Sequence, residues 1–205
     1  DAQLSRGLGD VYKRQTAFII GNGNSRLSFD LTELSKHGKM YGCNALYRDH
    51  IPDVLVSVDP PITEEISKYD IPLKTKHYAR KPLHDASHKL TEEQNSGFSS
   101  GPIACKLASL DAHDTQFLVG FDFASLNDNI NNVYAGTNGY WPKTNRATYH
   151  GNWVKQFSEI FEEFPEYKYY RVLDNVITYV PEEWDQVNNI ENINFETFNM
   201  MLNSI

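Results

Sequence analysis

The stretch that decides the fold is residues 16–25, Thr-Ala-Phe-Ile-Ile-Gly-Asn-Gly-Asn-Ser. Its apolar half predicts a buried first β-strand, and Gly21 to Ser25 predict a tight turn over a phosphate or a sugar. Glycine lets the backbone approach a ligand, and free N–H groups where a helix begins attract an anion. The alternative is an ordinary strand-to-helix turn, because the spacing differs from the dinucleotide fingerprint G-x-G-x-x-G.

The segment before this strand resembles a translated sequencing adapter. Residues 5–15, Ser-Arg-Gly-Leu-Gly-Asp-Val-Tyr-Lys-Arg-Gln, match residue for residue the peptide encoded by a transposase mosaic end. We therefore expect residues 1–15 to be an artefact of a sequence assembled from environmental reads, with the natural N-terminus missing, and leave them out of the fold prediction. We expect residues 16–205 to form a single nucleotide-binding α/β domain.

Composition narrows the class of ligand. The net charge is −8, which argues against a general nucleic-acid-binding protein but leaves room for a small anion in a local pocket. Cys43 and Cys105 lack the spacing of a metal site, so we expect both to be free in a reducing compartment. No apolar run has the length of a membrane span and no signal peptide is visible, so we expect a cytoplasmic protein.

Short apolar runs alternate with helical patterns, which predicts a Rossmann-like parallel sheet flanked by helices. We expect strands at 17–20, Lys39–Cys43, Val54–Val58, Leu73–Tyr78, Phe117–Val119 and Tyr169–Leu173. We expect helices at Thr63–Tyr69, from Ser99 onward, at Asn152–Phe164 and in the last part of the tail that begins at Pro181.

Two segments are expected to be loops. Residues 79–97 are polar and predict a surface loop, and four histidines, His77, His84, His88 and His113, are expected at the surface with no metal spacing. Residues 124–149 contain six asparagines and predict a long lid loop. We call residues 124–149 the lid loop below.

Polar residues follow the predicted strands. Because the carboxyl ends of parallel strands share one edge, we expect a ligand to bind there. The candidate binding residues at this edge are Gly21, Asn22, Gly23, Asn24, Ser25, Asn44, Asp59, Ser99, Ser100, Gly101 and Asp122.

The order of six short motifs over residues 17–175 resembles the small bacterial sialyltransferases that use CMP-activated sialic acid. The motifs are IIGNGNS, YGCNALY, SSGPIACKLA, FLVGFDF, VYAG and YHGNWVKQFSEIFEE. Two positions depart from the family pattern: Asn24 replaces a proline and Ser99 replaces a threonine. The sugar and the acceptor therefore stay open.

The resemblance implies a metal-independent glycosyltransferase with no cofactor besides the nucleotide sugar. In it, Asn22, Gly23 and Ser25 would contact the phosphate and sugar of the nucleotide, and Asn44 the donor. Residues 99–101 would bind at a helix N-terminus. Tyr134 would assist the leaving phosphate and His150 would act as general base on a glycan or another hydroxyl acceptor. A second copy of the chain is a further candidate partner.

Two other functions stay open. A pterin-pyrophosphokinase-like phosphoryl transferase would hold Mg²⁺ on Asp59 and Asp122. A nucleotide-binding protein without turnover, such as a viral ligand sponge, would use the same edge of the sheet. Each candidate also has a structural alternative: His150 begins a helix, Asp122 forms a turn and Asp59 precedes two prolines that end a strand.

Overall fold

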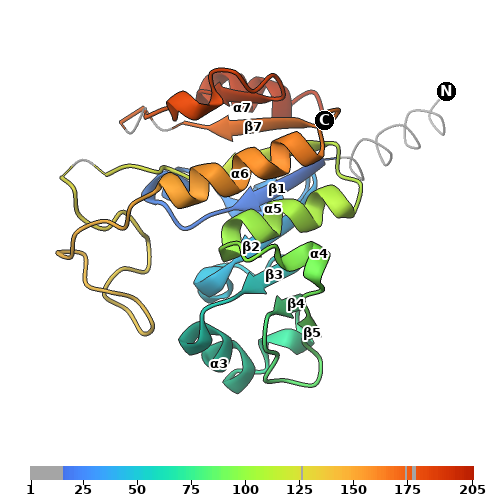
Figure 1. Ribbon diagram of the computed structural model, residues 1–205, viewed down its shortest axis with the longest axis vertical. Coiled ribbons are helices and arrows are strands. Elements are labelled where there is room, and N and C mark those ends of the chain that lie inside the picture. The colour runs from blue at the N-terminus through green and yellow to red at the C-terminus, as the bar shows by residue number, and fades with distance from the viewer. Residues whose placement is uncertain (1–15, 126, 174, 177–178) are drawn as a thin grey trace.

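The computed structural model describes residues 16–125, 127–173, 175–176 and 179–205, so the adapter-like residues 1–15 lie outside the described residues. Eight strands form one all-parallel sheet in the order β5-β4-β3-β2-β1-β6-β7-β8 (Figure 1). Helices pack on both faces of this sheet. The predicted Rossmann-like α/β class is therefore confirmed.

The strands, in chain order, are β1 Thr16–Ile20, β2 Lys39–Cys43, β3 Val54–Ser57, β4 Lys76–Ala79, β5 His88–Lys89, β6 Thr115–Val119, β7 Lys168–Val172 and β8 Ile190–Ile193. The α-helices are α2 Leu31–Leu34, α3 Pro60–Lys68, α4 Glu92–Asn95, α5 Ser100–Leu110, α6 Gly151–Glu163 and α7 Phe195–Leu202. Short 3₁₀ helices are η1 Asn24–Ser28, η2 Asn44–Arg48, η3 Ile71–Leu73 and η4 Glu182–Trp184. Within the described part of the chain, no helix has the length and apolar character needed to cross a membrane.

Both faces of the sheet are covered, which explains the nearly continuous apolar strands. Along β1, Ala17 and Ile19 belong to the core beneath α5 and α6, and Phe18 and Ile20 belong to the opposite core. Side chains of α3 and α7, including Phe198, complete that opposite core. In Figure 1, α5 and α6 lie across one face of the sheet while α7 lies beyond β7.

Three local predictions are wrong. The fourth strand begins at Lys76 rather than at residue 73, because 71–73 form a 3₁₀ turn. The predicted loop 79–97 contains β5 and α4. The tail contains a further strand, β8, whose residues Ile-Glu-Asn-Ile pair with β7 at the edge of the sheet. Short or half-polar edge strands carry no apolar run that would reveal them.

The chain order of the strands reverses at β1. Strands β2 to β5 extend the sheet to one side and β6 to β8 extend it to the other. In open α/β sheets, ligands bind at the carboxyl ends of the strands beside such a reversal. The lid loop follows β6 and projects beyond this edge (Figure 1). Among its described residues, the lid loop holds an isolated bridge between Asn129 and Arg146 and no helix or strand.

The predicted surface position is wrong for two of the histidines, since His77 and His113 are buried. His77 lies on β4, where its Nε2 atom is 2.8 Å from Ser57 Oγ and its Nδ1 atom is 2.8 Å from Ser87 Oγ. Burial lowers the pKa of His77 to about 4. An isolated histidine in a sequence does not reveal such hydroxyl partners.

This burial makes stability depend on pH. The unfolded chain takes up a proton near pH 6.5, whereas folded His77 resists protonation down to about pH 4. The stability that neutral His77 contributes is therefore complete above pH 6.5. It is lost as the pH falls toward 4, which lowers the free energy of unfolding by about 3 kcal/mol. Between pH 7 and pH 4.5, the free energy of unfolding measured in urea should fall less for His77→Gln than for the wild type. The partly exposed control His37→Gln should lose as much as the wild type, and an equal loss in His77→Gln would contradict the assignment.

Candidate functional site

The turn after β1 packs directly on the loop after β6. The N–H of Gly23 donates to the carbonyl of Gly120 at 2.8 Å. The N–H of Ser25 donates to Asp122 Oδ2 at 3.2 Å, and the Ser25 hydroxyl donates to the other oxygen of the same carboxylate. This contact joins the two strands at the reversal of the sheet and ties Asp122 to the turn.

The glycine at position 23 is required by this packing. A Cβ atom there would lie 2.5 Å from Asp122 Oδ2 and 2.7 Å from the Gly120 carbonyl oxygen. The N–H of Asn24 is also occupied, by Asn131 Oδ1 at 3.0 Å. The N–H groups of Gly23, Asn24 and Ser25 are therefore not free in this structure, because protein oxygens accept from them.

Asn22 lies just beyond the end of β1, and only one of the two polar atoms of its side-chain amide has a hydrogen-bond partner among the described residues. Its Nδ2 atom donates to the carbonyl of Cys43 at 3.3 Å, whereas its buried Oδ1 atom has no hydrogen-bond partner among the described residues. The lid loop rests on the same residue, since the N–H of Val133 donates to the Asn22 carbonyl at 2.8 Å. A buried acceptor without a donor is costly, so a ligand N–H or O–H would stabilise it.

Asn44 connects three predicted site residues. It adopts a left-handed backbone conformation, with φ of 52°, which asparagine tolerates better than most residues. Its Nδ2 atom donates to Asp59 Oδ2 at 3.3 Å, and its Oδ1 atom accepts from the Ser100 hydroxyl at 2.8 Å. The structure thus brings together the ends of β2 and β3 and the start of α5, as the sequence predicts for these residues.

The start of α5 is joined to α6 through Ser99. The indole N–H of Trp153 donates to the Ser99 hydroxyl at 3.1 Å, and the N–H of Ser99 donates to Gln156 Oε1 at 2.8 Å. His150 precedes α6 as its N-cap residue, and its Nε2 atom lies 3.0 Å from the Tyr179 hydroxyl. His150 is partly exposed, so its ring nitrogen can be reached from solvent.

Next to Ser99, Gly101 allows α5 to approach the loop after β6. A Cβ atom at position 101 would lie 2.7 Å from the ring of Phe121. Gly21 is similar, because a Cβ atom there would lie 2.5 Å from the Gly120 carbonyl oxygen. Both glycines therefore serve contacts between chain segments at the carboxyl edge of the sheet.

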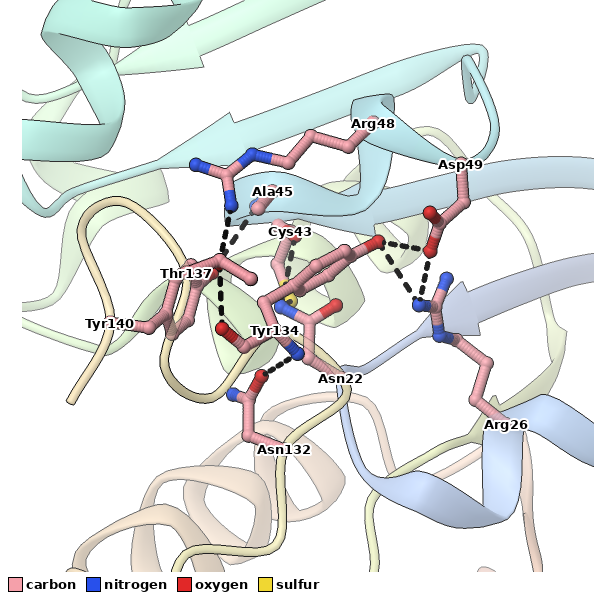
Figure 2. A network of polar contacts seen from close by, with 10 residues as sticks. All are labelled: Asn22, Arg26, Cys43, Ala45, Arg48, Asp49, Asn132, Tyr134, Thr137 and Tyr140. Atoms are coloured by element: carbon pink, nitrogen blue, oxygen red, sulfur yellow. Dashed lines mark hydrogen bonds and ion pairs between the residues drawn. The ribbon is translucent and has the colours of Figure 1, made fainter. Parts of the chain in front are cut away.

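Tyr134 is buried rather than exposed to a ligand. Its hydroxyl donates to Asp49 Oδ2 at 2.6 Å and accepts from Arg26 Nη2 at 3.0 Å, while Arg26 and Asp49 form an ion pair at 2.8 Å (Figure 2). Burial raises the pKa of Tyr134 strongly, and the hydrogen bond to Asp49 raises it further. The phenol is therefore protonated near neutral pH.

Sequence reasoning missed Arg26 and Asp49. Arg26 is 2 % exposed although it directly follows the turn after β1, and that position was the available signal. Together with His50 and several residues of 27–32, Arg26 and Asp49 line a cavity of about 270 Å³. None of the residues predicted from the sequence lines this cavity.

The two predicted magnesium ligands have different partners. Asp59 accepts from Asn44, whereas buried Asp122 accepts from Ser25 and from Asn131 Nδ2, the latter at 2.9 Å. In the part of the chain that the structure describes, no three side chains of His, Cys, Asp or Glu gather as a metal site would require.

Comparison with known proteins was made for the whole chain. No family model, no curated protein and no solved structure matches it.

The packing around Gly23 predicts a loss of stability on substitution. Gly23→Ala should lower the free energy of unfolding by about 1–3 kcal/mol, because overpacking a tight contact costs this much. Asn24→Ala is the control, because it lies in the same turn and its side chain is exposed. Chemical denaturation should show the larger loss for Gly23→Ala. An equal or smaller loss would mean that the turn adapts freely.

Proposed function

We propose that the protein is a glycosyltransferase that uses a nucleotide-activated sugar of the CMP-sugar type, with His150 as general base. The observation that carries the proposal is the hydrogen bond from Trp153 to Ser99. It attaches the helix that begins beside His150 to the helix start at which the donor is expected to bind. A base for the acceptor and a binding edge for the donor would then lie on neighbouring elements.

The donor would bind along the edge formed by Asn44, Asp59 and Ser100. Their amide, carboxylate and hydroxyl groups suit the hydroxyl and amino groups of a nucleoside. At the start of α5, the N–H groups of Ser100 and Gly101 precede the first hydrogen bond of the helix and favour an anion, whereas Pro102 has no N–H. The acidic net charge of the chain does not oppose such a local site.

Transfer would proceed by attack of an acceptor hydroxyl on the anomeric carbon of the sugar. His150 Nε2 would take the proton of that hydroxyl, in the place where the Tyr179 hydroxyl lies in this structure. The bond from the anomeric carbon to the phosphate oxygen breaks, and the nucleotide leaves with the electron pair. The protonated phenol of Tyr134 would donate to the leaving phosphate after turning from Asp49.

Removing the imidazole should separate binding from turnover. His150→Ala is expected to lower transfer about 10²–10⁴-fold, the usual range for loss of a general base. Donor affinity, measured by calorimetry, should barely change because the imidazole serves the acceptor. His88→Ala, on the exposed edge strand β5, is the matched control and should keep full activity. Full transfer activity in His150→Ala would contradict the proposal.

The donor itself can be found with a thermal-shift panel. The panel contains CMP, CDP, UDP, GDP, ADP and sugar nucleotides, each with and without Mg²⁺, because a ligand that binds the folded state raises the melting temperature. Stabilisation by CMP compounds without Mg²⁺ supports the proposal. A requirement for Mg²⁺ would favour a phosphoryl transferase, and binding without any transfer would favour a nucleotide-binding protein.

A further inference from the structure

The lid loop covers a row of hydrogen-bond donors at the ends of β1 and β2. Arg26 Nη2 donates to the Tyr134 hydroxyl at 3.0 Å, and the N–H of Ala45 donates to the Tyr140 hydroxyl at 3.3 Å. Two further donors that the lid loop covers are nitrogen atoms of a second arginine, Arg48. Figure 2 shows these side chains converging from the two strand ends and from the lid loop.

Arg48 uses two atoms to hold the lid loop. Its Nη1 atom donates to Thr137 Oγ1 and its Nη2 atom to the carbonyl of Asn138, both at 2.8 Å. Its Nε atom donates to Glu65 on α3 at 2.8 Å, and the other carboxylate oxygen of Glu65 accepts from Asn138 Nδ2 of the lid loop. If the lid loop moved away, Nη1 would lose its lid partner, whereas Nη2 would keep its ion pair with Glu65 at 2.6 Å.

The two guanidinium groups lie beside the same ring. The Arg26 Cζ atom is 5.3 Å and the Arg48 Cζ atom 5.7 Å from the centre of the Tyr134 ring. Arg26 is buried, and its Nε atom has no hydrogen-bond partner among the described residues. A buried guanidinium with an unpaired N–H is incomplete, because each such group needs an acceptor oxygen.

The acceptors that the lid loop supplies to these four donors are all oxygen atoms: two phenol oxygens, one hydroxyl and one carbonyl. A phosphate or diphosphate offers oxygens of the same acceptor type with the addition of negative charge, and arginine pairs bind such groups well. We propose that Arg26 and Arg48 form a binding site for a phosphate or diphosphate group, which the lid loop closes with its own oxygens. The ligand and the closed lid loop then exclude each other, so Tyr134 has to leave Arg26 and Asp49 before its phenol can donate to a bound phosphate.

Asp49 and Glu65 explain why the site stays folded without a ligand. Each pairs with one arginine, at 2.8 Å and 2.6 Å, so the cluster is neutral when the lid loop is closed. An entering phosphate would replace Tyr134, Thr137 and Asn138 as acceptors, and Asp49 and Glu65 would lose the hydrogen bonds that Tyr134 and Asn138 donate to them. Its apparent affinity is reduced by the fraction of molecules in which the lid loop is closed.

The anion site depends on the proposed function only for the identity of the nucleotide that would bind there. The site itself can be tested with inorganic pyrophosphate. Thr137→Val and Tyr140→Phe each remove one lid acceptor without touching the arginines. Each should tighten pyrophosphate binding about 3- to 10-fold, the effect of one lost hydrogen bond in the closed state. Thr144→Val, at an exposed threonine of the same loop, should bind as the wild type does.

The charge is tested with Arg48→Gln, which should weaken pyrophosphate binding at least 10-fold while circular dichroism shows a folded protein. The inference is overturned if the lid variants bind no more tightly than the wild type, if Arg48→Gln binds equally well, or if no variant binds pyrophosphate. CMP titrated into the same proteins separates the two proposals. If Arg48→Gln leaves CMP binding unchanged, the transferase proposal stands and the anion site is contradicted. If pyrophosphate binds in a way that depends on the lid loop and CMP does not bind, the anion site stands and the transferase proposal is contradicted.

Discussion

Gly23 donates its N–H to the Gly120 carbonyl, and Ser25 holds the Asp122 carboxylate with both its N–H and its hydroxyl. A side chain at position 23 would overlap both of its neighbours. This contact closes the space between the ends of β1 and β6, where open α/β sheets commonly admit a ligand. The polar edge that remains extends toward β2 and β3, with Asn44 at its centre and the lid loop over it.

The position of the lid loop follows from the same contact. Asn131 donates to Asp122 and to the Ala124 carbonyl and accepts from the N–H of Asn24, so the loop is attached to the turn itself. Two residues later, Val133 donates to the Asn22 carbonyl. The next residue is Tyr134, whose hydroxyl accepts a hydrogen bond from Arg26. The closed arrangement is therefore built from the glycine turn outward, and Arg26 connects the turn to the lid loop.

The sequence predicts the sheet well because buried parallel strands are apolar along their whole length, as in Thr16–Ile20. It also predicts that Asn44, Asp59 and Ser100 meet, since all three follow strands or begin a helix at one edge. It does not reveal what a residue contacts across the chain. In this structure Gly21, Gly23 and Gly101 allow close approach of neighbouring backbone, carboxylate and ring atoms, and their expected role toward a ligand stays a prediction.

The burial of charged and titratable side chains is the other feature that local sequence patterns do not predict. Arg26 has the same sequence signature as an exposed arginine, and its burial depends on Asp49 and on Tyr134, which lies 108 residues away. His77 is similar, because its partners Ser57 and Ser87 lie 20 and 10 residues away. Such polar contacts become visible when the strands are assembled, whereas apolar periodicity is already present in a single segment.

The central claim is that the oxygens of the lid loop occupy a phosphate site. Amide hydrogen exchange measured by NMR, with and without saturating pyrophosphate, tests it at two amides. The N–H of Val133 bonds to Asn22 when the lid loop is closed, and the N–H of Ala45 bonds to Tyr140. We predict that pyrophosphate speeds exchange at Val133 as the lid loop leaves, while Ala45 stays slow because a phosphate oxygen replaces the phenol. Exchange at Val133 that is unchanged or slower with pyrophosphate would contradict the account.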